Sequence, residues 1–170
     1  MLYNFTGDKD GRGPLASLVF DGSGNLYGTT YLGGGGPCVY GCGVVFKLAP
    51  SSGGGWTETV PHSFAGGKAG RMPLAPVVFD RAGNLYGTTF VGGGGGALCY
   101  YSPDNAHGCG VVFMLTPTSS GWDYTVLKTF NDKSGAMPQA GLVSDSVGNF
   151  YGTTAGDGST TFGTVYEITP

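Results

Sequence analysis

One seventeen-residue segment occurs three times in this chain, and it constrains the fold more than any other feature. The copies span residues 14–30, 73–89 and 138–154, and each ends in Tyr-Gly-Thr-Thr. In each copy a short apolar run leads into an Asp-x-x-Gly-Asn turn and a second short run. A regular internal repeat is typical of stacked supersecondary units. The chain is therefore expected to fold as an array of similar pieces.

The composition favours an all-β array. The chain has 35 glycines among 170 residues, and they fall between short apolar runs, as turns do between strands. Only 11% of the residues are charged, which argues against a disordered chain. A net charge of −3 without a basic stripe predicts no nucleic-acid partner. No apolar run is long enough to span a bilayer, so we expect no transmembrane segment.

Each repeat is predicted to form four strands, which we name a to d in chain order. The first has strands at 15–21, 26–32, 43–50 and 56–64. The second has strands at 74–80, 85–91, 110–117 and 122–130, and the third has only three, at 140–145, 150–154 and 163–170. The chain opens with Leu2–Gly7, whose sequence resembles strand d. The first strand is thus expected to complete the last four-stranded unit.

Such an offset is typical of a β-propeller, here one domain, 1–170, of three four-stranded antiparallel blades. The blades cover about 14–64, 73–130, and 138–170 together with strand 2–6. Three blades are fewer than the usual four to eight. We expect either that two chains join as a homo-oligomer into a six-bladed ring, or that the chain is a piece of a longer propeller. A closed three-bladed toroid is less favoured, because its axis would be crowded.

Four cysteines form two local pairs, Cys38 with Cys42 and Cys99 with Cys109. Cys42 and Cys109 hold equivalent repeat positions, so they should lie too far apart to bridge each other. Two local disulfides are the favoured prediction, and they indicate an oxidising compartment. A four-cysteine zinc site and reduced thiols stay as alternatives. The chain carries no recognisable signal peptide, which conflicts with secretion.

The segments Asp-x-x-Gly-Asn-Leu-Tyr-Gly-Thr-Thr and Gly-Val-Val-Phe-Lys-Leu-Ala-Pro resemble the Gloeo/Verruco (GloVer) tandem repeat of secreted or surface-attached bacterial proteins. The chain is more distantly similar to NHL-repeat and gluconolactonase-type propellers. The third copy departs from the pattern, with Ser144 in place of phenylalanine and no cysteine pair. The resemblance implies a secreted or cell-surface location and carries no catalytic motif across.

Propeller wiring would place the long b–c and d–a loops on one face. These loops are expected at 31–43, 90–110, 155–163, 7–14, 65–73 and 131–138. Variable loops on a rigid scaffold are where binding and catalytic residues usually lie. Candidate ligand-binding residues on these loops are Tyr100, Tyr101, Asn105, Arg12 and Arg71.

Catalytic or metal-binding residues have weaker signals. His107 and Asp104, in the loop closed by Cys99 and Cys109, are candidates for a general base. Asp157 of the next blade is a further catalytic candidate, and with His107 and Asp104 it forms a candidate set of metal ligands. Asp8 and Asp10 begin a pattern that resembles a calcium loop but lacks its closing carboxylate. Calcium is therefore the one cofactor the sequence suggests.

Residues that recur in every copy favour structural roles. The aspartates at the turn, Asp21, Asp80 and Asp145, are expected to accept backbone N–H bonds. The glycines of Tyr-Gly-Thr-Thr are expected to permit close packing. Trp56 and Trp122 are predicted to pack between blades rather than stack on sugars, and His62 is expected to have no site role.

Three functions stay open on the sequence. The favoured one is an extracellular module that binds a glycan, small molecule or protein on the long-loop face. The second, implied by the lactonase-type resemblance, is calcium-dependent hydrolysis of a lactone or ester. The third is a purely structural piece of a longer repeat protein.

Overall fold

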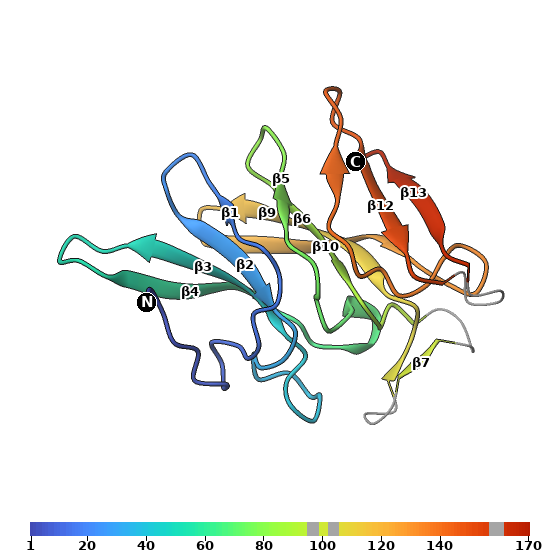
Figure 1. The fold of residues 1–170 in the computed structure, drawn as a ribbon, viewed down its shortest axis with the longest axis horizontal. Helices are drawn as coiled ribbons and strands as arrows, with labels where there is room; N and C mark the ends of the chain where they lie inside the picture. Colours follow the sequence, from blue (N-terminus) through green and yellow to red (C-terminus); the bar gives the residue numbers. More distant parts are fainter. Residues whose placement is uncertain (95–98, 102–105, 157–161) are drawn as a thin grey trace.

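A computed structural model describes residues 1–94, 99–101, 106–156 and 162–170 of the chain. These residues form an all-β structure of three antiparallel sheets that follow one another in chain order (Figure 1). The prediction of an all-β array of repeated antiparallel units is confirmed. The sheets form an open row, and none closes on itself.

The first two sheets have four strands each, in the predicted a-b-c-d order. The first sheet contains β1 (Val19–Phe20), β2 (Leu26–Thr30), β3 (Val44–Pro50) and β4 (Trp56–Ser63). The second contains β5 (Val78–Phe79), β6 (Leu85–Thr89), β9 (Val111–Thr118) and β10 (Gly121–Thr129). A 3-10 turn at Gly67–Ala69 and a hairpin of β7 (Tyr100–Tyr101) and β8 (Ala106–His107) lie in the connecting loops.

The third sheet has three strands, β11 (Val143–Ser144), β12 (Phe150–Thr154) and β13 (Thr164–Ile168). Residues 1–10 form no strand, so the single chain does not show strand 2–6 completing this sheet, and that pairing stays a prediction. The physical reason why the single chain lacks this pairing is distance, because the N-terminus lies beside the first sheet and β13 lies at the opposite end of the row (Figure 1).

Strand a is much shorter than predicted in every repeat, with two paired residues instead of six or seven. In the second repeat Pro73 and Pro76 precede the paired residues, and proline has no N–H to donate to a ladder. The chain before β5 instead packs side chains between sheets, where Ala75 and Val77 are buried. The other strands end within two residues of their predicted bounds.

The cores lie between neighbouring sheets, so each sheet behaves as a blade. Tyr27 and Val45 of the first blade pack against Leu85, Phe113 and Leu115 of the second. At the next junction, Tyr86 and Val112 of the second blade pack against Phe150 and Tyr166 of the third. The back of one blade therefore meets the front of the next at both junctions. No helix among the described residues is long and apolar enough to cross a membrane.

Candidate functional site

A hollow of about 420 Å³ opens on the long-loop face, between the first and second blades. Its walls come from three connections, the b–c loop of the first blade, the d–a loop that follows it and the b–c loop of the second blade. The described lining residues are Pro37, Cys38, Val39, Ala65, Gly66, Gly67, Lys68, Arg71, Gly94 and His107. The hollow thus combines loops that are far apart in sequence.

The described lining of this hollow carries basic side chains and no carboxylate. Lys68 is exposed on the 3-10 turn, which glycines with positive φ bound on both sides. Arg71 is buried, and its backbone pairs with Val91, with N···O distances of 3.0 and 3.4 Å. His107 lies on β8, at the edge of the second blade's loop. The structure therefore brings Arg71 and His107, two sequence candidates, to one site.

A second hollow of about 360 Å³ lies on the other side of the Cys38–Cys42 loop. Arg12, which holds the same repeat position as Arg71, lines it together with Asp8 and the exposed side chain of Tyr40. The guanidinium of Arg12 stands 5.6 Å from the centre of the Tyr40 ring. One cation, one carboxylate and an exposed aromatic ring thus share this second hollow.

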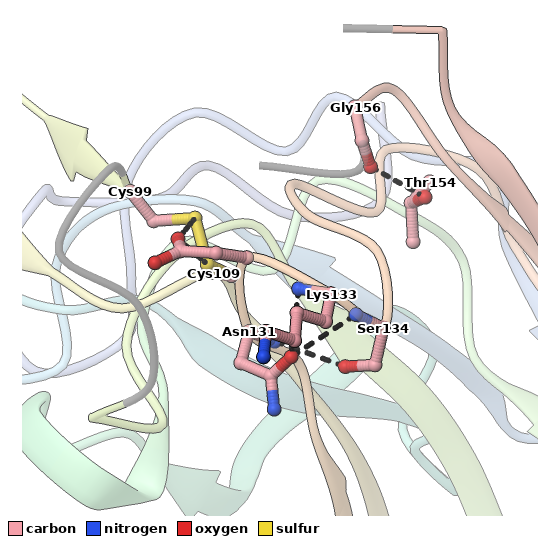
Figure 2. The surroundings of a disulfide bond; sticks show 8 residues. Cys99, Cys109, Asn131, Lys133, Ser134, Thr154 and Gly156 are labelled. Atoms are coloured by element: carbon pink, nitrogen blue, oxygen red, sulfur yellow. Dashed lines mark hydrogen bonds between the residues drawn. A yellow bond between two sulfur atoms is a disulfide. The ribbon is translucent and has the colours of Figure 1, made fainter. Parts of the chain in front are cut away.

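Both predicted disulfides are present. Cys38 bonds to Cys42, with a Cα–Cα distance of 5.2 Å. Cys99 bonds to Cys109, with a Cα–Cα distance of 5.0 Å (Figure 2). No free cysteine occurs among the described residues. The zinc and reduced-thiol alternatives therefore do not apply to this structure. Each disulfide ties a long loop to the end of strand c, next to a hollow or a neighbouring loop.

A carboxylate faces the second disulfide. Oδ1 of Asp132 lies 3.9 and 3.8 Å from the sulfurs of Cys99 and Cys109. Disulfide sulfurs carry no proton, so these contacts are not hydrogen bonds. The three residues place ligand atoms within 4.8 Å of one another. Bonded sulfurs are not thiolates, however, and calcium requires several oxygens, so the group does not fit either metal as it stands.

The two aspartates of the calcium-like segment do different work. Asp10 accepts hydrogen bonds from the Thr6 amide, the Thr6 hydroxyl and the Tyr3 hydroxyl at 2.7, 2.7 and 3.0 Å. Burial alone would raise the pKa of Asp10, but these hydrogen bonds outweigh it and lower the pKa. Asp8 is exposed, and its backbone oxygen accepts from Gly11 and Gly34. Among the described residues, no third histidine, cysteine or acidic side chain joins Asp8 and Asp10 in a group that could hold a metal ion.

The remaining candidate residues from the sequence lie outside the part of the chain that the structure describes. Asp104, Asn105 and Asp157 lie outside the described residues, and so do the side chains of Tyr100 and Tyr101. A general base at His107 with Asp104 or Asp157, and calcium-dependent hydrolysis with it, stays a prediction.

The repeated aspartates hold the a–b turns, as predicted. Oδ1 of Asp80 accepts from the amides of Ala82 and Asn84, and its Oδ2 accepts from the Asn84 side chain and the Tyr86 hydroxyl. Asp21 and Asp145 repeat this arrangement. The expected glycine donor occurs only in the third blade, where Gly148 donates at 2.8 Å. The hydrogen bonds of these carboxylates therefore stabilise the a–b turns.

His62 and Trp122 belong to the packing between blades, whereas Trp56 packs on the front of the first blade. The His62 ring stacks on Tyr124 of the second blade, with centroids 4.1 Å apart and planes 5° apart. Burial lowers the pKa of His62 to about 4. Trp122 meets Tyr27 of the first blade edge-on at 6.1 Å, and Trp56 packs against the core at the front of the first blade.

Sequence reasoning missed Lys68, Val39 and Tyr40. Lys68 had a signal, because it is the only cation in the d–a loop that precedes Arg71. Val39 and Tyr40 lie between the two cysteines of a loop already predicted to be tethered. No protein family matches this chain in a scan of known families, and a search of curated proteins finds no significant match.

Proposed function

We propose that this protein is an extracellular binding module for an anionic ligand of the acidic-carbohydrate class. The observation that carries this proposal is the hollow between the first two blades, whose described lining includes Lys68 and Arg71 and no carboxylate. A volume of about 420 Å³ lies in the range of small-molecule sites. The long-loop face, favoured on sequence grounds, is where this hollow opens.

The chemistry of the lining supports an anion. Arginine and lysine bind carboxylate and sulfate groups through charge-assisted hydrogen bonds. Val39, which lines both hollows, adds exposed apolar surface near Lys68, and Tyr40 adds an exposed aromatic ring beside Arg12 in the second hollow. Aromatic rings with a polar edge suit ligands that have both apolar and hydroxylated faces, as sugars do. An acidic sugar would use both kinds of surface.

An extracellular location is part of the proposal. Two disulfides are typical of oxidising compartments. The GloVer-like repeat, which resembles secreted or surface-attached proteins, points the same way. Cell-surface carbohydrates are a common source of acidic sugars for such a module.

Isothermal titration with an oligogalacturonide and with its neutral galactose counterpart tests the proposal. We expect the acidic oligosaccharide to bind and the neutral one to bind at least tenfold more weakly. Lys68→Ala should weaken acidic binding about fivefold to tenfold, equivalent to about 1–1.4 kcal/mol. Lys133→Ala is the matched control, because Lys133 is an exposed lysine on the equivalent loop of the next blade. Equal affinity of the Lys68→Ala and wild-type proteins, or equal binding of both sugars, would contradict the proposal.

A further inference from the structure

The N-terminal segment, residues 2–6, lies where strand d of a preceding blade would lie. Phe5 meets Phe46 of the first blade edge-on, with ring centres 4.9 Å apart and planes at 68°. Phe64, which ends strand d of the first blade, meets Phe113 of the second blade at 5.2 Å and 70°. Phe130 meets Tyr166 of the third blade at 4.8 Å and 65°. Three equivalent aromatic pairs therefore recur at three blade fronts.

The residue two positions before each of these phenylalanines also contacts the phenylalanine ring in a similar way. The Tyr3 ring stands edge-on to Phe5 at 5.1 Å, and the His62 ring stands edge-on to Phe64 at 4.7 Å. In the second blade Lys128 lies 5.6 Å from the Phe130 ring centre. Residues 2–6 thus copy the side-chain placement of strand d without forming a strand.

The third blade lacks the strand that this segment could supply. Its outer strand, β13, pairs only with β12 among the described residues. In the two complete blades the equivalent strands β3 and β9 each pair with a strand d. The ladder edge of β13 is therefore an open position for a strand of the type of Leu2–Thr6.

The back face of the third blade is apolar and uncovered. Val165 is 79% exposed, whereas Val45 and Val112, at the same repeat position, are fully buried by the next blade. Phe162 is 90% exposed, and its equivalents Cys42 and Cys109 are also fully buried. The exposure follows from the position of this blade at the end of the row.

The front face of the first blade also exposes apolar side chains, among them one whose equivalents are buried at the fronts of the other two blades. Leu18 is 47% exposed, whereas Val77 and Leu142, its equivalents in the following blades, are 3% and 7% exposed. Leu15 and Phe20 are exposed beside it. At both junctions within the chain, a face of this kind packs on a back face like that of the third blade.

We propose that a second copy of this chain covers both surfaces, with residues 2–6 of one copy pairing with β13 of the other. The observed registers, Val44 opposite Ser63 and Val111 opposite Thr129, place Asn4 opposite Thr164 of the second copy. Phe64 and Phe130 donate backbone hydrogen bonds to Gly43 and Gly110, so Phe5 donates to Gly163 of the second copy.

Two such junctions close the two chains into one ring of six four-stranded blades. The interface joins different surfaces, front to back, and an interface of this kind gives a closed ring when its rotations complete one turn. This inference does not depend on the ligand proposed above, because the surfaces involved are the front of the first blade and the back of the third.

Val165→Lys tests the interface by sedimentation equilibrium. The wild-type chain is expected at twice the 17.3 kDa of one copy, and Val165→Lys at 17.3 kDa with an unchanged far-ultraviolet circular dichroism spectrum. Val147→Lys is the matched control, because Val147 lies on a turn whose equivalents are exposed in every blade, and it should stay dimeric. A wild-type mass of 17.3 kDa, or a dimer that survives Val165→Lys, would overturn the proposal.

A designed disulfide tests the register. Asn4→Cys and Thr164→Cys, made as separate variants and mixed, should form a covalent dimer on mild oxidation. Asn4→Cys mixed with Thr169→Cys, which lies off the register, should not. A crosslink that forms only within one chain, when Asn4→Cys and Thr164→Cys are combined, would show a closed three-bladed toroid and contradict a second copy.

Discussion

Single residues at one repeat position do different work in each blade of this protein. Tyr3, His62 and Lys128 are equivalent in sequence, yet only His62 is a half-buried ionisable ring between two blades. Its Nε2 has no hydrogen-bond partner in the described structure. Its ring neighbours Phe64 and Tyr124 place no carboxylate against the imidazole, and burial disfavours the charged imidazolium. The fold therefore keeps this histidine neutral.

Protonation of His62 should destabilise the protein as the pH falls. The pKa of His62 is about 4 in the fold against an ordinary value of 6.5, so the unfolded chain binds the extra proton between these values. Stability should therefore fall by about 2 kcal/mol between pH 7.5 and pH 5. Urea unfolding at the two pH values measures this difference. His62→Tyr, which copies Tyr3, should flatten it; an equal loss in this variant would rule out His62 as its source.

At the scale of elements, the sequence predicted strands b, c and d well and strand a poorly. Alternation and the Gly-Asn turns locate Leu26–Thr30 and Val44–Pro50 within two residues. Strand a depends on contacts with another blade, as in the bond from the Thr29 hydroxyl to the Ala75 carbonyl. Periodicity carries no information on such contacts.

The candidate site was predicted less completely than the strands. The long loops and both cysteine pairs follow directly from the repeat and its interruptions. The side chains that meet at the hollow, such as Lys68 and His107, lie 39 positions apart in loops with no periodic pattern. Their proximity comes from blade packing, which the sequence does not show.

The glycine of Tyr-Gly-Thr-Thr permits an aromatic ring to lie against strand b. A Cβ at Gly87 would stand 2.6 Å from the ring of Phe113, which is fully buried. Gly87→Ala should therefore destabilise the fold by about 1–3 kcal/mol in chemical unfolding. Gly53→Ala is the control, because a Cβ there meets nothing within 4 Å. If the two variants were equally stable, close packing at Gly87 would not matter.

The two disulfides should stabilise the fold measurably, because each closes a loop in the unfolded chain. The Cys99–Cys109 bond closes a separation of 10 residues, for which chain entropy predicts about 3 kcal/mol. Cys99→Ser with Cys109→Ser should lower the thermal midpoint, measured by calorimetry. Cys38→Ser with Cys42→Ser removes a disulfide that closes a separation of only 4 residues, so it should lower the thermal midpoint less. An unchanged midpoint in both double variants would remove the disulfides as stabilising elements.

In the whole molecule, the two end blades each present one face that no other blade of the chain covers. The first blade presents a front face partly covered by Tyr3 and Phe5, and the third presents an uncovered back face around Val165. Both faces are buried at the junctions inside the chain. The central claim is that a second copy supplies the same junction twice more.

Hydrogen exchange at residues 2–6 tests this claim most directly. Among the described residues of the single chain, no backbone hydrogen bond involves the amide of Tyr3 or Phe5. Pairing with β13 of a second copy would engage these alternate amides. We predict slow exchange at both amides in the wild-type protein, lost on dilution and in Val165→Lys. Fast exchange at both amides in concentrated wild-type protein would contradict the account.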